Sequence, residues 1–327
     1  MKMTKLVAAA AALWLSGEAA LAQQVLRFGH VGEPGSLFAQ SAEHFAALAN
    51  ERLEGRAEVQ VFGSSQLGSD REMMQRLRLN QQTFSLPSSI MSSIAAEFGV
   101  FEMPYIIENR EHIRAVADEM LDEVFNPAAE REGFHILAVW ENGFRHITNN
   151  TRPINVPADL RGIRLRIPGG EWRARMFQAY GANPTPMSFS DVFTALQTGV
   201  IDGQENPYTQ IASANFQEVQ RYLSITGHVY TPAFVAVDAN HFARLDPEVQ
   251  EILREAARET RAFVHETAER LENELLDVIA SAGVAVNEAD TAAFVEASGA
   301  IYEEFAATVP GGPELIERIN ALRPATN

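Results

Sequence analysis

Apolar and polar positions follow two periods along the chain, one of two residues and one close to 3.6. Residues 57–62 alternate between apolar and polar side chains, which predicts a strand. Residues 36–53 place Leu37, Phe45 and Leu48 on one stripe, which predicts a helix. The same patterns predict further strands at 25–28, 83–86, 135–140, 145–148 and 163–167, and further helices at 111–128, 171–180 and 188–199. This alternation favours α/β lobes with mainly parallel sheets.

Two helix features are more specific. Ser69 followed by Glu72 is a capping box and predicts the start of a helix. Residues 247–279 form the longest amphipathic pattern, with no proline or glycine after Pro247. A helix of this length exceeds the diameter of one lobe, so we expect it to run along both lobes. A coiled-coil helix is the alternative, but the apolar repeat is irregular for such a seam.

The N-terminal segment has the pattern of a secretory signal. Lys2 and Lys5 precede an apolar run over residues 6–15, which is too short to span a bilayer as a mature helix. Ala20-Leu21-Ala22 supplies a small-x-small cleavage pattern, so we expect residues 1–22 to be removed and the mature chain to begin at Gln23 in the periplasm. A membrane anchor is the alternative interpretation.

Composition limits the class of protein. A chain of 327 residues with 46% hydrophobic residues is long enough for two lobes that fold without disulfides, and it contains no cysteine. The absence of cysteine excludes thiol catalysis and thiolate metal sites. The net charge is −17, and it becomes −18 without the signal segment, whose Lys2, Lys5 and Glu18 sum to +1. Such a chain repels nucleic acid and anionic lipid, so an anionic ligand requires locally placed cations.

Motifs that carry a catalytic mechanism are absent from the sequence. No two histidines lie three to five residues apart, and there is no Gly-x-Ser-x-Gly elbow, Walker loop or dinucleotide-binding glycine fingerprint. Asp202 and Glu205 are an acid pair, but carboxylates at short spacing are common. We therefore expect neither an enzyme nor a cofactor.

Arg166 is the main candidate for ligand binding. It lies at the end of a predicted strand, before Pro168 and the Gly169-Gly170 turn. Parallel sheets bind ligands beyond the carboxyl ends of their strands, and a guanidinium matches a carboxylate with two hydrogen bonds. The alternative is a surface ion pair, which we consider for Arg164 on the same strand face.

Several motifs occur in an order that points to one family. They are Ser65-Gln66-Leu67-Gly68, Met103-Pro104-Tyr105, Asn142-Gly143-Phe144-Arg145, the run from Arg161 to Pro168, Gly181 to Met187, Ala195 to Gly199 and Asp202 to Pro207. The mature chain resembles the periplasmic solute-binding subunit of TRAP (tripartite ATP-independent periplasmic) transporters, the DctP-like family. The resemblance implies two α/β lobes around a hinge, an organic acid bound between them, and delivery to the small and large permease subunits.

We divide the mature chain accordingly. Lobe I is expected to comprise residues 23–143 and 232–271, and lobe II residues 144–231 and 272–327. We expect a monomer. The family's principal carboxylate-binding arginine matches Arg166, a second ligand-side arginine matches Arg145, the closing asparagine matches Asn206, and an aromatic wall residue matches Phe189. From the residues alone, Arg145 could instead form an interlobe salt bridge, Asn206 a turn, and Phe189 part of a helix core.

Contacts from lobe I are less constrained by the sequence. Glu33 lies in a glycine-bearing loop after the first strand, where it could accept ligand hydroxyls or remain an exposed loop acid. Ser88 and Ser89 follow the strand at 83–86 and could donate to a ligand. Trp140 and Trp172 could line the cleft or pack in the core. We prefer Trp172 as the residue that selects ligand size, because it follows the Arg166 loop.

These residues lead to a preferred ligand and to rival functions. Relatives that bind through a metal place a tryptophan after the acid matching Glu205, whereas Asn206 follows here, so no metal is implied. Two arginines with Glu33 nearby favour a hydroxy acid or sugar acid over a dicarboxylate, which the acid would repel. The alternatives are a periplasmic enzyme that uses Asp202 or Glu205 on a carboxylate, and a ligand-sensing module of a signalling receptor.

Overall fold

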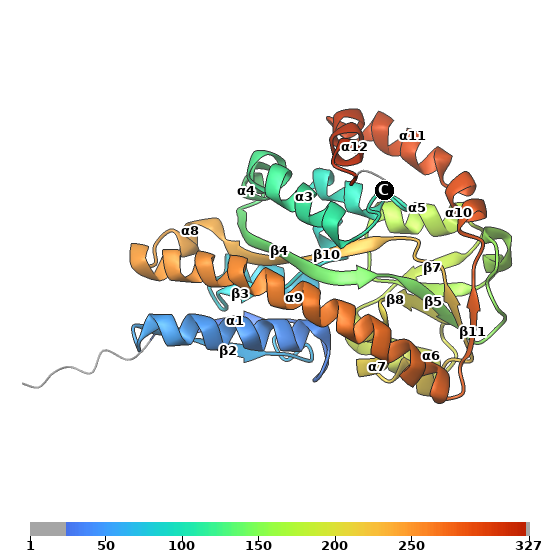
Figure 1. Ribbon diagram of the computed structural model, residues 1–327, viewed down its shortest axis with the longest axis horizontal. Coiled ribbons are helices and arrows are strands. Elements are labelled where there is room, and N and C mark those ends of the chain that lie inside the picture. The colour runs from blue at the N-terminus through green and yellow to red at the C-terminus, as the bar shows by residue number, and fades with distance from the viewer. Residues whose placement is uncertain (1–23, 325–327) are drawn as a thin grey trace, which may run out of the picture.

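Two β-sheets lie side by side in the computed structural model, which describes residues 24–324 (Figure 1). The predicted signal segment, residues 1–22, and its cleavage point at Ala22 and Gln23 lie outside the described residues. The long helix α9 (Pro247–Ser281) extends past both sheets. The prediction of a two-lobed α/β fold with one long helix along both lobes is confirmed.

The first sheet has the order β2-β1-β3-β10-β4. Its strands are β1 (Gln24–Gly29), β2 (Ala57–Phe62), β3 (Phe84–Ser85), β4 (Phe134–Phe144) and β10 (Tyr230–Asp238). Strand β1 pairs in parallel with β2 and β3, while β10 is antiparallel to β3 and β4. Helices α1 (Leu37–Leu53) and α9 pack on one face, and α4 (Asn126–Arg131) contacts β4 from another side.

The second sheet has the order β11-β9-β5-β8-β6-β7. Its strands are β5 (His146–Asn149), β6 (Arg164–Ile167), β7 (Asn183–Pro186), β8 (Gly203–Asn206), β9 (Tyr222–Ile225) and β11 (Ala285–Glu288). Strand β5 is antiparallel to both of its neighbours, β8 and β9. Both sheets are therefore mixed rather than mainly parallel, because the strands at the crossover, β4, β5 and β10, run against their neighbours.

The crossover between the sheets is short. Strand β4 ends at Phe144 and β5 begins at His146, so only Arg145 stands between the two sheets. The returning chain lies beside it, and the Arg145 backbone N–H donates to the Val229 carbonyl at 2.9 Å. The prediction of a strand at 145–148 was one residue early. Its consequence is that Arg145 occupies the crossover itself.

Helix α9 ties the lobes together, and Asp246 caps its start by accepting from the Glu248 and Val249 backbone N–H groups. It packs against α1 of the first lobe and against α7 (Tyr208–Ser213) of the second. Its buried residues include Leu253, Val264 and Leu271, as the sequence pattern predicted.

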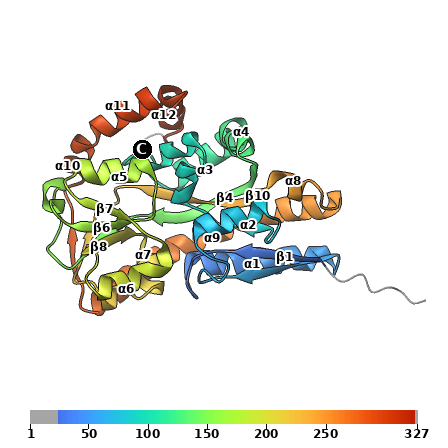
Figure 2. The same cartoon turned by 180° about the vertical axis from the view of Figure 1, so that it is seen from behind.

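The C-terminal helices lie over the top of the molecule in Figure 1 and are seen from behind in Figure 2. They are α10 (Thr291–Ala297), α11 (Gly299–Thr308) and α12 (Gly312–Ala321). Helix α11 contacts α5 (Glu171–Ala179) of the second lobe, and α12 contacts the 3₁₀ segment Ala96–Glu102 of the first. These helices touch both lobes, and the lobe boundaries given above stay a prediction.

Local predictions differ in detail. The Ser69–Glu72 capping box is present at the start of α2 (Asp70–Arg78). The predicted helix at 111–128 is α3 (Arg110–Met120), a π-turn at Leu121–Phe125 and then α4. The predicted helix at 188–199 begins as a 3₁₀ turn, Phe189–Asp191, before α6 (Val192–Gln197). The short helix α8 (Ala239–Phe242) follows β10. Across residues 24–324, no helix is both long and apolar enough to cross a membrane.

Candidate ligand-binding site

A narrow cleft separates the two lobes near the crossover. Residues from both sides line it: Val31, Phe38, Asp70, Ser88, Ser89, Ile90, Asn142, Arg145, Arg166, Pro168, Phe189, Asn206 and Gln210. This set contains four of the residues predicted to bind the ligand from the second lobe or the crossover: Arg145, Arg166, Phe189 and Asn206. The cleft is the place where a ligand would contact both lobes at once.

Arg166 is the buried cation of the cleft. It is only 2% exposed, and its Nε and Nη2 donate to the Met187 carbonyl at 3.0 and 2.7 Å. No carboxylate within residues 24–324 forms an ion pair with it, whereas Arg164 on the surface pairs with Asp202 at 2.5 Å. Burial, followed by the charge of Arg145, lowers the pKa of Arg166 to about 9. An unpaired buried charge is unfavourable, so this site favours an anion.

Arg145 lines the cleft but is already paired. Its Nε donates to Glu205 Oε2 at 2.5 Å, and its Nη2 donates to Glu205 Oε1 at 2.9 Å and to the Glu205 carbonyl at 2.5 Å. Both side chains are buried. Arg145 therefore forms a structural salt bridge, but its partner Glu205 lies in the same predicted lobe, so this pair is not the interlobe bridge that the sequence left as an alternative.

Glu205 is the centre of a buried network. Arg173 bridges Glu205 and Glu102 at 2.7 Å each, and His228 Nε2 lies 3.1 Å from Glu205. Burial alone would raise the pKa of Glu205, but the charges of Arg145 and Arg173 hold it well below its usual range. Burial lowers the pKa of His228 to about 4, so this histidine is neutral at pH 7. Glu102 belongs to the segment Ala96–Glu102, so the network connects the crossover with that segment.

Asn206 and Phe189 line the cleft together with Arg166. Asn206 ends β8, is 3% exposed, and donates from Nδ2 to Gln204 Oε1 at 2.6 Å. The Phe189 ring centroid is 6.0 Å from the Arg166 guanidinium carbon and 5.6 Å from the Phe216 ring. Their predicted ligand roles stay predictions, but both side chains occupy the positions that those roles need.

Ser88 and Ser89 bring lobe I into the cleft, as predicted. Ser88 Oγ donates to the Pro232 carbonyl at 2.7 Å and accepts from Asn142 Nδ2 at 3.3 Å. Ser89 Oγ is buried, and no partner for it exists among residues 24–324. The free hydroxyl of Ser89 is thus available to a ligand.

The structure places Trp172 outside the cleft lining, which corrects the preference for it as the residue that selects ligand size. Trp140 and Glu33, for which the sequence left a cleft position open, also lie outside this lining. Trp172 packs against Phe305 with ring centroids 5.1 Å apart, because the buried face of α5 turns toward α11. A Cβ on Gly99 would lie 2.7 Å from the Trp172 ring, so the tryptophan is held tightly in the core. Trp140 is also in the core and donates to the Ala257 carbonyl at 2.9 Å. Glu33 is half-buried in its loop and is not part of the cleft lining.

Two polar residues of the cleft were missed by sequence reasoning. Asp70, the first residue of α2, is half-buried and close enough to Arg166 to feel its charge. Burial raises the pKa of Asp70 to about 6, against the opposing effect of Arg166. Gln210 of α7 donates to Asn142 Oδ1 at 3.3 Å, and its own buried Oε1 has no partner among residues 24–324. The Ser69 cap was visible in the sequence, but nothing local indicated that the next residue faces the other lobe.

Metal ligands do not gather anywhere in the described part of the chain. No group of three or more histidine, aspartate or glutamate side chains there is arranged to hold an ion. Of the two arginines that line the cleft, Arg145 is paired with Glu205 and Arg166 is bound to a backbone carbonyl.

A two-lobed α/β fold with a polar cleft at the crossover defines the class of solute-binding proteins. Residues 28–308 match the sequence model of the bacterial extracellular solute-binding proteins of family 7, DctP, and the chain belongs to this family. The resemblance to TRAP solute-binding subunits is thereby confirmed.

Known proteins resemble this chain in sequence and structure over nearly its whole length. The chain is 31% identical to the 2,3-diketo-L-gulonate-binding periplasmic protein YiaO of Escherichia coli over 320 residues, covering 95% of this chain and 98% of the relative. The sugar acid binding protein of Advenella mimigardefordensis in complex with galactonate superposes with a TM-score of 0.87 at 30% identity, covering 92% and 97%. A TRAP solute-binding protein from a Polaromonas species bound to D-erythronate gives 0.88 at 30%, covering 92% and 100%.

Proposed function

We propose that this chain captures a small hydroxylated monocarboxylic acid, of the sugar acid class, in the interlobe cleft and delivers it to a membrane permease. Export to the periplasm and action as a monomer are part of this proposal. The family is periplasmic, and its relatives are binding proteins rather than enzymes.

The single observation that carries the proposal is the state of Arg166. It is a buried cation with no carboxylate partner in residues 24–324, while the neighbouring Arg145 and Arg173 are both paired with Glu205. A ligand carboxylate would supply the missing charge and two hydrogen bonds. One unpaired arginine calls for one carboxylate, which favours a monoacid.

The other polar groups of the cleft suit hydroxyls. Asp70 and Gln210 offer oxygen acceptors, and Ser89 offers an unpaired hydroxyl. A second carboxylate near Asp70 would be repelled by its charge. Asp70 thus takes the role of hydroxyl acceptor that the sequence had left open for Glu33. Galactonate and D-erythronate, the ligands named for two structural relatives, both combine one carboxylate with several hydroxyls.

Capture proceeds by closure of the lobes. The ligand contacts Arg166 from the second lobe and Ser89 or Asp70 from the first, so only the closed arrangement satisfies both sides. Small-angle scattering of the mature chain should show a smaller radius of gyration with ligand than without it. Unchanged dimensions at saturation would contradict closure.

A thermal-shift series tests the ligand class. Galactonate and D-erythronate should raise the unfolding temperature by several degrees at saturation, because they bind the native state. Succinate should raise it less, and galactitol, which has the hydroxyls without the carboxylate, should have no effect. Stabilisation by galactitol but by neither sugar acid would overturn the proposal. Recovery of chemically unaltered acid from the complex would distinguish transport from turnover.

A further inference from the structure

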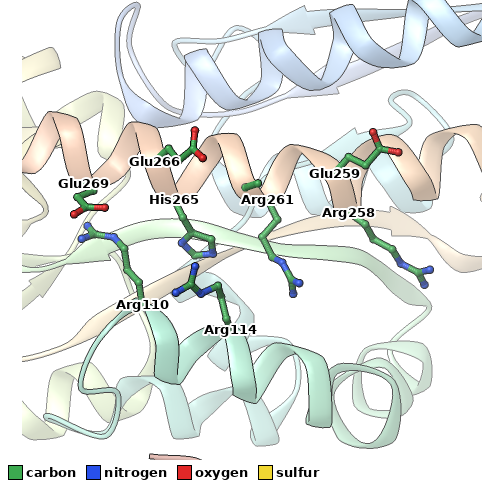
Figure 3. A pocket seen from close by; sticks show the side chains of 9 residues that line it. Arg110, Arg114, Arg258, Glu259, Arg261, His265, Glu266 and Glu269 are labelled. Atoms are coloured by element: carbon green, nitrogen blue, oxygen red, sulfur yellow. The ribbon is translucent and has the colours of Figure 1, made fainter. Parts of the chain in front are cut away.

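A second basic site lies on the outside of the molecule, in a groove between α3 and α9 (Figure 3). The groove is open to solvent and has about 1130 Å³ of unfilled space. Arg110 and Arg114 of α3 line one side, Arg258 and Arg261 of α9 line the other, and His265 lies between them. Four arginines in one groove are unexpected on a chain with a net charge of −17.

The charges on this stretch of α9 are segregated. Figure 3 shows Glu259 and Glu266 on the side of the helix that faces α1, whereas Arg258, Arg261 and His265 point toward α3. Glu259 is also engaged there, since Arg52 of α1 donates to both of its carboxylate oxygens at 2.6 and 2.8 Å. Glu259 and Glu266 therefore do not neutralise the arginine side of the groove, whereas Glu269 lies beside Arg110 at one end of it (Figure 3).

The four arginines of the groove differ in whether they have an ion-pair partner. Arg110 is held by Glu141 and Glu272, and Arg261 by Asp118. Arg114 and Arg258 are exposed, and their side chains have no ion pair or hydrogen bond with any of residues 24–324.

His265 provides an independent sign that the groove is a site. It is 7% exposed, and its Nδ1 lies 3.0 Å from Glu141 Oε2. Its ring nonetheless reaches the groove lining, and its other nitrogen has no partner among the described residues. A nearly buried imidazole with one nitrogen free toward a row of arginines offers a directional contact to whatever lies in the groove.

We propose that the groove between α3 and α9 binds an extended, acidic segment of a partner protein. The axial rise of α9 from Arg258 to His265 is about 10 Å. An extended chain covers this distance with roughly three residues. Consecutive acidic side chains of such a segment can meet Arg258 and Arg114 in turn, while a small anion contacts only one point of the row. The proposal does not depend on the ligand of the interlobe cleft, because none of the groove's residues line that cleft.

The test uses a fluorescein-labelled hexaglutamate peptide and the full mature chain. Fluorescence anisotropy should give saturable binding, with a hexaglutamine peptide as the negative control. The double variant Arg114→Gln/Arg258→Gln should weaken binding by about tenfold, since two exposed charge contacts are lost. The matched double variant Arg161→Gln/Arg244→Gln removes the same charge at two other exposed, unpaired arginines and should leave binding unchanged.

Several outcomes decide the proposal. Absence of hexaglutamate binding, or an equal loss in both double variants, would overturn it, because attraction would then be nonspecific. Binding of inorganic phosphate as tight as that of hexaglutamate would also overturn it, in favour of a small-anion site. Arg166→Met should keep full hexaglutamate binding, and Arg114→Gln/Arg258→Gln should keep sugar acid binding, so failure at one site is distinguishable from failure at the other.

Discussion

The interlobe cleft and the groove between α3 and α9 both gather arginines, but they hold them in opposite ways. Arg145 and Arg166 of the cleft lining, and Arg173 of the adjoining Glu205 network, are almost fully buried, and their positions are fixed by carboxylates or by a carbonyl. In the groove, Arg114 and Arg258 are exposed and unpaired within the described chain. A buried cation favours one well-placed anion strongly, whereas an exposed row attracts anions weakly and tolerates variation. The same residue type is thus suited to specificity in one region and to reversible contact in the other.

The largest expected effect concerns the buried network. Glu205→Gln removes the carboxylate that compensates Arg145 and Arg173, so we expect the free energy of unfolding to fall by about 3–5 kcal/mol. Urea denaturation followed by circular dichroism measures this. Asp202→Asn, which breaks the surface pair with Arg164, is the matched control and should change stability little. Equal stabilities of the two variants would remove the distinction between buried and exposed pairs.

Arg166→Met should abolish tight acid binding while the chain remains folded. The loss expected in calorimetry is about 2–5 kcal/mol of binding free energy, since the charge pair lies in a desolvated cleft. The unfolding temperature without ligand should not fall, because the variant removes a buried cation that lacks an ion pair.

Arg164→Met is the control on the same strand, and it should bind sugar acids like the wild type. An Arg166→Met chain that still bound galactonate with unchanged affinity would show that the cleft needs no buried cation.

Binding should depend on pH through Asp70. Its pKa of about 6 in the free protein means that it becomes protonated as pH falls through 6. A protonated Asp70 no longer accepts two hydroxyls as a carboxylate does, so sugar acid affinity should drop by up to about tenfold between pH 7.5 and pH 5.

The stability of the free protein should shift in the opposite sense. Because burial raises the pKa of Asp70 in the folded state above its usual value of 3.8, the folded state binds more protons between pH 6 and 4. The contribution of Asp70 to stability therefore increases as pH falls through this window. Asp70→Asn should remove both effects, and a wild-type pH profile in this variant would assign them to another group.

The smallest expected effect is a difference between the two regions in how their binding depends on salt. Raising NaCl from 50 to 300 mM shortens the screening length, so hexaglutamate binding to the groove should weaken severalfold. Galactonate binding in the cleft should change less, because buried pairs are screened much less. Equal salt dependence of the two titrations would contradict the contrast drawn between them.

The sequence was informative where local pattern decides structure. The alternation at residues 57–62, the Ser69–Glu72 capping box and the length of α9 each depend on neighbouring residues, and each matches the structure. Arg166 could be placed near the end of a strand because the alternation of its neighbours predicts that strand, and strand ends of such sheets face ligand clefts. The antiparallel pairing of β5 was not predictable, because it depends on how the chain crosses between the sheets.

The site was harder to predict wherever it depends on distant parts of the chain. Trp172 was expected in the cleft because it follows the Arg166 loop, but the orientation of α5 is set by its packing on Phe305 and Gly99. Asp70 was overlooked because its proximity to Arg166 exists only once the two lobes meet. Family resemblance supplied the roles of Arg145 and Asn206, and the structure added the pairing with Glu205 that no local pattern contains.

Helix α9 has a mechanical consequence. Its 35 residues extend over about 50 Å, and after Pro247 it contains no proline or glycine at which it could kink readily. Because it is fastened to α1 at one lobe and to α7 at the other, any separation of the lobes must flex the rod or slide one lobe along it. We therefore expect the helix to act as an elastic element whose stiffness opposes separation of the lobes.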